Sequence, residues 1–141
     1  MPSTLLSGHS ERTPISARSF CRQVGTAGRR VNIRTARRRC ETAAVAAAAA
    51  FAVPIGELHV AAWRSSYIAF VRQSAMYLSH VVFGVNLSEV GRAFGRDRTA
   101  AAHACRLIED RRGDPAVDTV LASLENACGA LHRRLAAPVQ P

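Results

Sequence analysis

The sequence predicts an all-α domain of about six helices, preceded by a disordered basic tail. Hydrophobic residues make up 48% of the 141 residues, but aromatic residues make up only 6%. The core is therefore built mainly from Ala, Val and Leu, which suits closely packed helices better than a β-sandwich. From about residue 41 onward, apolar residues recur at helical spacing between start and stop signals.

Charge divides the chain into two parts. All 19 basic residues are Arg, and the net charge is +9. Residues 1–40 hold nine Arg and a single acidic residue, whereas residues 41–141 are close to neutral. Residues 1–38 are rich in Gly, Ser, Thr, Pro and Arg without a sustained apolar period, so we expect a disordered tail there. Such a tail favours polyanions without sequence preference, and the alternative is a leader with no specific role.

The predicted domain spans residues 41–135. Its first half begins with an Ala-rich helix. Residues 41–52 have high helix propensity, and Pro54 ends this helix. A turn and a short second helix are expected over residues 54–62. Residues 64–66 break the pattern, which predicts a loop before the next helix.

A third helix is predicted over residues 70–82. Four apolar residues lie on one face of it, at spacings of four, three and four: Val71, Ala75, Leu78 and Val82. Gly84 follows as a helix stop. Asn86 then starts a new helix as its cap, with Glu89 placed to complete a capping box.

A central helix-turn-helix is predicted from residue 87 onward. It consists of a short helix over 87–94, a tight turn over 95–97, and a longer helix over 98–111 that Asp97 caps at its start. The longer helix turns four apolar residues inward: Ala101, Ala104, Cys105 and Ile108. Gly113 stops it, and Asp114-Pro115 opens a last helix that reaches about Leu135.

The start of the longer helix carries side chains suited to reading DNA. In a helix-turn-helix, the second helix lies in the major groove and presents its N-terminal residues to base edges. Arg98 can bind guanine through two hydrogen bonds, and Thr99 can bond a base or contact a thymine methyl group. Arg96, in the turn, is placed to meet a phosphate. An ordinary helical hairpin has the same pattern, so the pattern alone leaves both interpretations open.

Four short segments resemble the C-terminal DNA-binding domain (domain IV) of the bacterial replication initiator DnaA. They are RQSAMYL at 72–78, LSEVGRAFG at 87–95, RDRT at 96–99 and HACR at 103–106, with a weaker likeness at 55–58. The resemblance implies a stand-alone DnaA-like helix-turn-helix protein that binds a short duplex site. It also implies that Asp97, Arg98 and Thr99 take the base-reading positions.

The chain departs from that family in four respects. Only Gly95 remains of two glycines before the signature, and Arg98 and Ala100 replace a histidine and a threonine of the family. The basic loop ahead of the third helix is largely missing, because residues 67–71 stand where arginines are expected. These differences predict lower affinity, or a contribution of the basic tail to binding.

The predicted function is sequence-specific binding of double-stranded DNA, with a role in regulating transcription or the initiation of DNA replication. The predicted DNA-binding residues are Arg64, Arg72, Arg92, Arg96, Asp97, Arg98, Thr99 and His103. A structural cap is the alternative role for Asp97, and a packing or solvent-exposed residue is the alternative for His103. The alternative function is a protein-interaction domain that retains the fold without specific DNA binding.

Other classes of function find no support in the sequence. There is no Lys and hence no phosphate-binding loop of the GxxxxGK[ST] type, so we expect no ATPase module and no nucleotide. The four cysteines form no CxxC pair, so no metal or other cofactor is expected, and no side-chain arrangement suggests an enzyme. The longest apolar run, 42–54, is too short for a bilayer, so a cytoplasmic, nucleoid-associated protein is expected. Besides DNA, other replication or regulatory proteins are expected partners.

Overall fold

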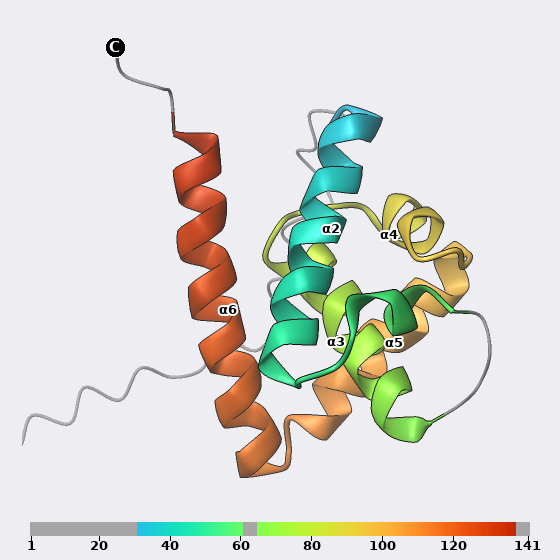
Figure 1. Ribbon diagram of the computed structural model, residues 1–141, viewed down its shortest axis with the longest axis vertical. Coiled ribbons are helices and arrows are strands. Elements are labelled where there is room, and N and C mark those ends of the chain that lie inside the picture. Colours follow the sequence, from blue (N-terminus) through green and yellow to red (C-terminus); the bar gives the residue numbers. More distant parts are fainter. Residues whose placement is uncertain (1–30, 61–64, 138–141) are drawn as a thin grey trace, which may run out of the picture.

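The computed structural model describes residues 31–60 and 65–137 (Figure 1). All regular structure in these ranges is helical, in the order α2 (Ile33–Ala50), a 3-10 helix η1 (Ile55–His59), α3 (Ser66–Val81), α4 (Leu87–Ala93), α5 (Arg98–Arg111) and α6 (Pro115–Ala136). The predicted all-α class is confirmed. Most of the expected tail, residues 1–30, lies outside the described residues.

Helix α2 begins well before the expected start near Glu41. The side chain of Asn32 caps it by accepting a hydrogen bond from the Arg34 N–H at 3.1 Å. The Ala-rich face extends backward through the buried Ala36 and Cys40. Residues 33–38 are therefore helical and not part of a disordered tail. Their arginines, which resemble a polar leader, lie on a helix whose other face is apolar.

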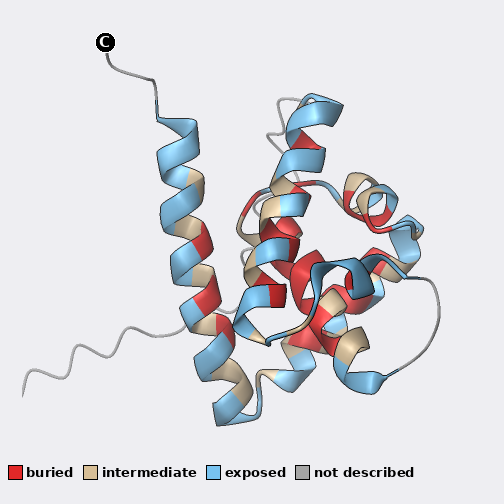
Figure 2. Ribbon diagram, in the orientation of Figure 1, coloured by how far each residue is buried: buried red, intermediate tan, exposed pale blue. Residues whose placement is uncertain are grey.

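Helix α3 forms the centre of the domain and packs against α2 on one side and α5 on the other. Figure 2 shows the buried residues concentrated where these helices meet. The largest fully buried side chains of the whole core are Tyr77, Phe83, Leu58, Leu78, Ile108 and Leu121. Of the four-residue stripe predicted for this helix, Val71, Ala75 and Leu78 are buried, and Val82 is half-buried.

The first turn of α3 also begins earlier than expected. Ser65 caps it by accepting a hydrogen bond from the Tyr67 N–H at 3.1 Å. The Tyr67 hydroxyl then donates to the Phe51 carbonyl, at the end of α2, at 2.7 Å. Residues 67–71, which stand where the family has a basic loop, are thus helical and tie α3 to α2.

The last helix, α6, buries only part of its length. Leu121, Leu124 and Cys128 face the body of the domain, and the final turns are exposed (Figure 2). Its predicted start is confirmed: Asp114 accepts a hydrogen bond from the Ala116 N–H at 2.9 Å, with Pro115 in the first turn. No helix in residues 31–60 and 65–137 is long and apolar enough to cross a membrane.

Candidate nucleic-acid interface

Helices α4 and α5 form the predicted helix-turn-helix. Helix α4 begins where expected, because the Asn86 side chain accepts a hydrogen bond from the Glu89 N–H at 2.9 Å. The Glu89 carboxylate does not complete the predicted capping box. It pairs with the exposed guanidinium of Arg92 at 2.8 Å.

Two glycines shape the turn between α4 and α5. Gly95 has a φ of +67°, in the left-handed region that glycine adopts without strain. Gly91 lies inside α4, where a Cβ atom would stand 2.5 Å from the Asp97 carbonyl oxygen. The Gly91 carbonyl also accepts a hydrogen bond from the Arg96 N–H at 2.7 Å.

Gly91 is a positioning residue that the sequence interpretation missed. A glycine inside a predicted helix lowers helix propensity, so its presence there is a signal of close backbone approach. The backbone of the turn packs directly onto α4 at this point, which sets the start of α5 relative to α4. No side chain is needed for that contact.

The first turn of α5 presents its side chains to solvent. Asp97 caps the helix, as predicted, by accepting a hydrogen bond from the Ala100 N–H at 2.7 Å. Arg98, Thr99 and His103 are exposed. Among the described residues, no carboxylate forms an ion pair with Arg98. The inward face is buried as predicted, at Ala101, Ala104, Cys105 and Ile108.

A hollow of about 150 Å³ opens between α3 and α5 beside this first turn. Ile68, Met76 and Ala104 are among its apolar lining residues. Arg72, Arg96 and His103 are its charged or ionisable lining residues. The structure thus brings three of the predicted DNA-binding residues to one place.

Arg72 has a structural role that the sequence did not predict. Its Nε donates to the Leu58 carbonyl at 2.8 Å, and its Nη2 donates to the Val60 carbonyl at 2.9 Å. These bonds hold η1 and Val60 against α3. Burial, followed by the charge of Arg96, lowers the pKa of Arg72. A phosphate contact by Arg72 stays a prediction, and Arg72 lines the same hollow as Arg96.

The other predicted residues lie in different settings. Arg92 is on α4 and is held by an exposed ion pair, which contributes little energy. Arg64 lies outside the described residues. No cluster of three or more metal-ligating side chains occurs within residues 31–60 and 65–137.

Comparison with known proteins finds a family whose helix-turn-helix domain is similar to this region. Residues 41–108 match the family described as "Bacterial dnaA protein helix-turn-helix". The chain is 50% identical over 52 residues to the chromosomal replication initiator protein DnaA of Mesorhizobium japonicum, covering 36% of this chain and 11% of that protein. It is 42% identical over 55 residues to the DnaA of Symbiobacterium thermophilum, covering 38% and 12%. The chain therefore spans about a tenth of the length of these relatives. No solved structure gives a significant match.

Proposed function

Because residues 41–108 form a DnaA-like helix-turn-helix domain, a DNA-binding type, we propose that this chain binds specific sites in double-stranded DNA. In this proposal α5 lies in the major groove with its first turn toward the base edges. The observation that carries the proposal is the start of α5, which is fixed at the backbone by Gly91 and Asp97 while Arg98 and Thr99 remain exposed.

Base reading is assigned to the exposed side chains of that turn. Arg98 can donate two hydrogen bonds to the O6 and N7 atoms of guanine, and Thr99 can contact a thymine methyl group or bond a base. His103 lies about one turn further along, where it can reach a base or a phosphate. Asp97 uses one carboxylate oxygen for the cap, which leaves the other for a cytosine amino group.

Phosphate binding is assigned to the arginines around that turn. Arg72 and Arg96 repel each other, and no described carboxylate forms an ion pair with either of them. A DNA phosphate would supply the missing negative charge. Arg92 is itself exposed and can exchange its half-buried partner Glu89 for a phosphate at small cost, since ion pairs near the surface are weak.

Occupancy of specific sites would make this chain a regulator of transcription or of replication initiation. Both roles require only that the bound domain block or recruit other proteins at its sites. The matched relatives are replication initiator proteins, which favours the second role. Other replication or regulatory proteins are then the expected protein partners.

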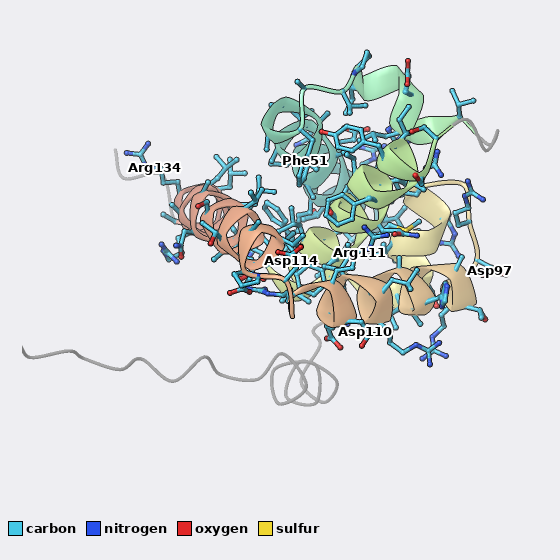
Figure 3. All side chains as sticks on the ribbon, turned by 90° about the horizontal axis from the view of Figure 1, so that it is seen from below. Phe51, Asp97, Asp110, Arg111, Asp114 and Arg134 are labelled. Atoms are coloured by element: carbon cyan, nitrogen blue, oxygen red, sulfur yellow. The ribbon has the colours of Figure 1, made fainter. Side chains whose placement is uncertain are left out.

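The test is selection of bound sequences from a random DNA pool by the full chain, followed by gel-shift titration. Arg98→Ala should weaken binding of the selected site and relax base preference at one position, by about tenfold or more. Arg96→Ala should weaken all sequences alike. Arg134→Ala is the matched control, since Figure 3 shows this residue on the side of the molecule opposite Asp97.

Two outcomes would contradict the proposal. If Arg98→Ala binds with the affinity and preference of the parent chain, α5 is not the reading helix. If the parent chain binds no DNA even at low salt, the alternative of a protein-interaction domain is supported. The full chain is required in these titrations, because a fragment starting at residue 41 would remove the first two turns of α2.

A further inference from the structure

We propose that the hollow between α3 and α5 is a binding site for a small organic anion, namely a carboxylate with a ring-sized apolar body. We further propose that such a ligand competes with DNA for the same arginines. The proposal that the ligand binds depends only on the hollow itself, whereas the proposal of competition rests on the proposed DNA-binding function.

The size and lining of the hollow define the apolar part of the ligand. Its volume is about 150 Å³. A cavity of about this volume holds a benzene-sized group when its walls are apolar. Ile68, Met76 and Ala104 supply such walls, and Met76 and Ala104 belong to the buried core. A single ring or a branched aliphatic group fits, and a nucleotide does not.

The positive charge at the hollow defines the polar part of the ligand. Arg72 and Arg96 both line it, and His103 lines it from the exposed side of α5. Burial and the charge of Arg96 both disfavour the charged form of Arg72, so its pKa is lowered. An anion between the two guanidinium groups would offset this repulsion. A planar carboxylate matches the forked donors of arginine.

Arg72 is already oriented for this role. Its Nε and Nη2 are bonded to the carbonyls of Leu58 and Val60, so the guanidinium plane is fixed before any ligand arrives. Fixed donors lose little conformational entropy on binding, which favours a small ligand.

Competition follows from shared donors. The proposed function assigns Arg72 and Arg96 to DNA phosphates, and an anion held between them would neutralise the charge that attracts the duplex. A ligand that binds the DNA-free form more tightly than the bound form shifts the protein toward release. The hollow would then make DNA occupancy responsive to a metabolite of this chemical class.

The binding test uses the full chain without DNA and sodium benzoate as the probe, followed by calorimetry or NMR titration. Benzyl alcohol presents the ring without the charge, and sodium acetate presents the charge without the ring. We expect saturable one-to-one binding of benzoate, at least tenfold tighter than either control. Equal affinity for benzoate and acetate would overturn the proposal, because it would indicate general anion attraction.

A matched pair of variants locates the site. Ala100 lines the hollow and Ala102 does not, yet both are half-buried residues of α5. Ala100→Leu should fill the hollow and weaken benzoate binding at least tenfold, while Ala102→Leu should not. Arg96→Gln removes charge without adding bulk and should weaken binding as well. Parent-like benzoate affinity in both Ala100→Leu and Arg96→Gln would place the ligand elsewhere and overturn the assignment.

The competition test adds benzoate to the protein bound to its selected DNA site at constant ionic strength. Benzoate should lower DNA affinity at concentrations where acetate has no effect. If DNA binds and benzoate never displaces it, the proposed competition is wrong, although the proposed ligand site is still supported by the binding test. If benzoate binds and no DNA does, the proposed function fails and the ligand site remains.

Discussion

The two ends of α5 are held in opposite ways (Figure 3). At its start, near Asp97, the turn is fixed by backbone contact with Gly91 and by the left-handed Gly95. At its end, beyond Arg111, the turn is fixed by a cluster of charged side chains around Arg112. The first arrangement leaves side chains at the start of α5 exposed. In the second, the side chains at the end of the helix are bonded to one another.

The cluster around Arg112 joins three helices. Its Nε donates to Asp118 at 2.6 Å, and its Nη1 donates to the Tyr77 hydroxyl at 3.0 Å and to the Glu125 carboxylate. The Tyr77 hydroxyl donates to the same carboxylate at 3.0 Å. Burial and then the charge of Glu125 raise the pKa of Tyr77. Burial disfavours the charge on Arg112, but hydrogen bonds to Asp118, Glu125 and Tyr77 outweigh it and raise its pKa.

The difference between the two ends shows how a helix can be held rigidly while side chains at one end stay available to bind a ligand. A side chain that fixes a helix in place can contact DNA only through polar atoms that it does not already use within the protein. Arg112 is therefore structural, although it stands on the same helix end as Arg111. At the start of α5 the backbone does the positioning, so Arg98 and Thr99 remain without structural duties in the described residues.

The largest expected effect comes from Gly91→Ala. The added Cβ atom would stand 2.5 Å from the Asp97 carbonyl oxygen and 2.7 Å from its carbonyl carbon, so α4 and the turn must separate. Overpacking of this kind should lower the free energy of unfolding by about 3 kcal/mol. Urea unfolding measures this loss of unfolding free energy. Gly56→Ala is the control, since nothing lies within 4 Å of its Cβ position. Equal stability of the two variants would show that the turn is not held by this contact.

The next largest effect is expected from Arg112→Met. This change leaves the partly buried Glu125 without its cation and should cost about 2 kcal/mol of unfolding free energy. Tyr77→Phe keeps the Arg112–Glu125 pair and should cost about 1 kcal/mol. Both folded variants should bind DNA as the parent chain does. A changed base preference in either variant would contradict the view that the end of α5 is structural and only its start contacts DNA.

The caps of α5 and α6 provide a smaller and matched comparison. Asp97→Ala and Asp114→Ala each remove one side-chain bond to a helix N-terminus and should each cost about 1 kcal/mol. Only Asp97→Ala should also weaken DNA binding, because only its helix carries the exposed residues that are proposed to read DNA. Asp97→Asn keeps the cap, so any remaining loss of DNA preference in that variant would belong to base contact. Equal effects of the two Ala variants on DNA binding would contradict this.

The smallest effect concerns a contact outside both turns. His132 on α6 packs edge-on against Phe83, with ring centres 5.4 Å apart. Burial, followed by the charge of Arg39, lowers its pKa below the ordinary 6.5. The unfolded chain therefore takes up the proton first, so stability is highest above about pH 6.5 and falls as the pH drops through the lowered pKa. His132→Gln should show a shallower loss of the urea midpoint between pH 7.5 and 5. An unchanged slope would show that this contact does not titrate.

Much of the fold could be predicted because its signals are local. The bounds of α5, Arg98–Arg111, follow from a cap at one end and a stop at the other, and both act within a few residues. The caps at Asn86, Asp97 and Asp114 are equally local. The family likeness of residues 41–108 likewise rests on residues close together in the chain.

Several of the errors and omissions share one physical cause, which is contact between residues far apart in the sequence. The early start of α2 is stabilised from a distance, because Arg39 donates from Nη1 to the Phe83 carbonyl at 3.0 Å. The early start of α3 similarly uses the contact of Tyr67 with Phe51. The bonds of Arg72 to Leu58 and Val60 and the cluster around Arg112 involve partners that no local pattern specifies.

The sequence by itself therefore determined the helical class, the helix-turn-helix and the bounds of α5, because propensity, capping and periodicity act over one or two turns. Only the tertiary structure decided which arginines remain available. Packing brings Arg72 and Arg96 to one hollow without a carboxylate, and it surrounds Arg112 with carboxylates. The sequence lists the charges, but the electrostatic role of each depends on neighbours that the fold brings near it.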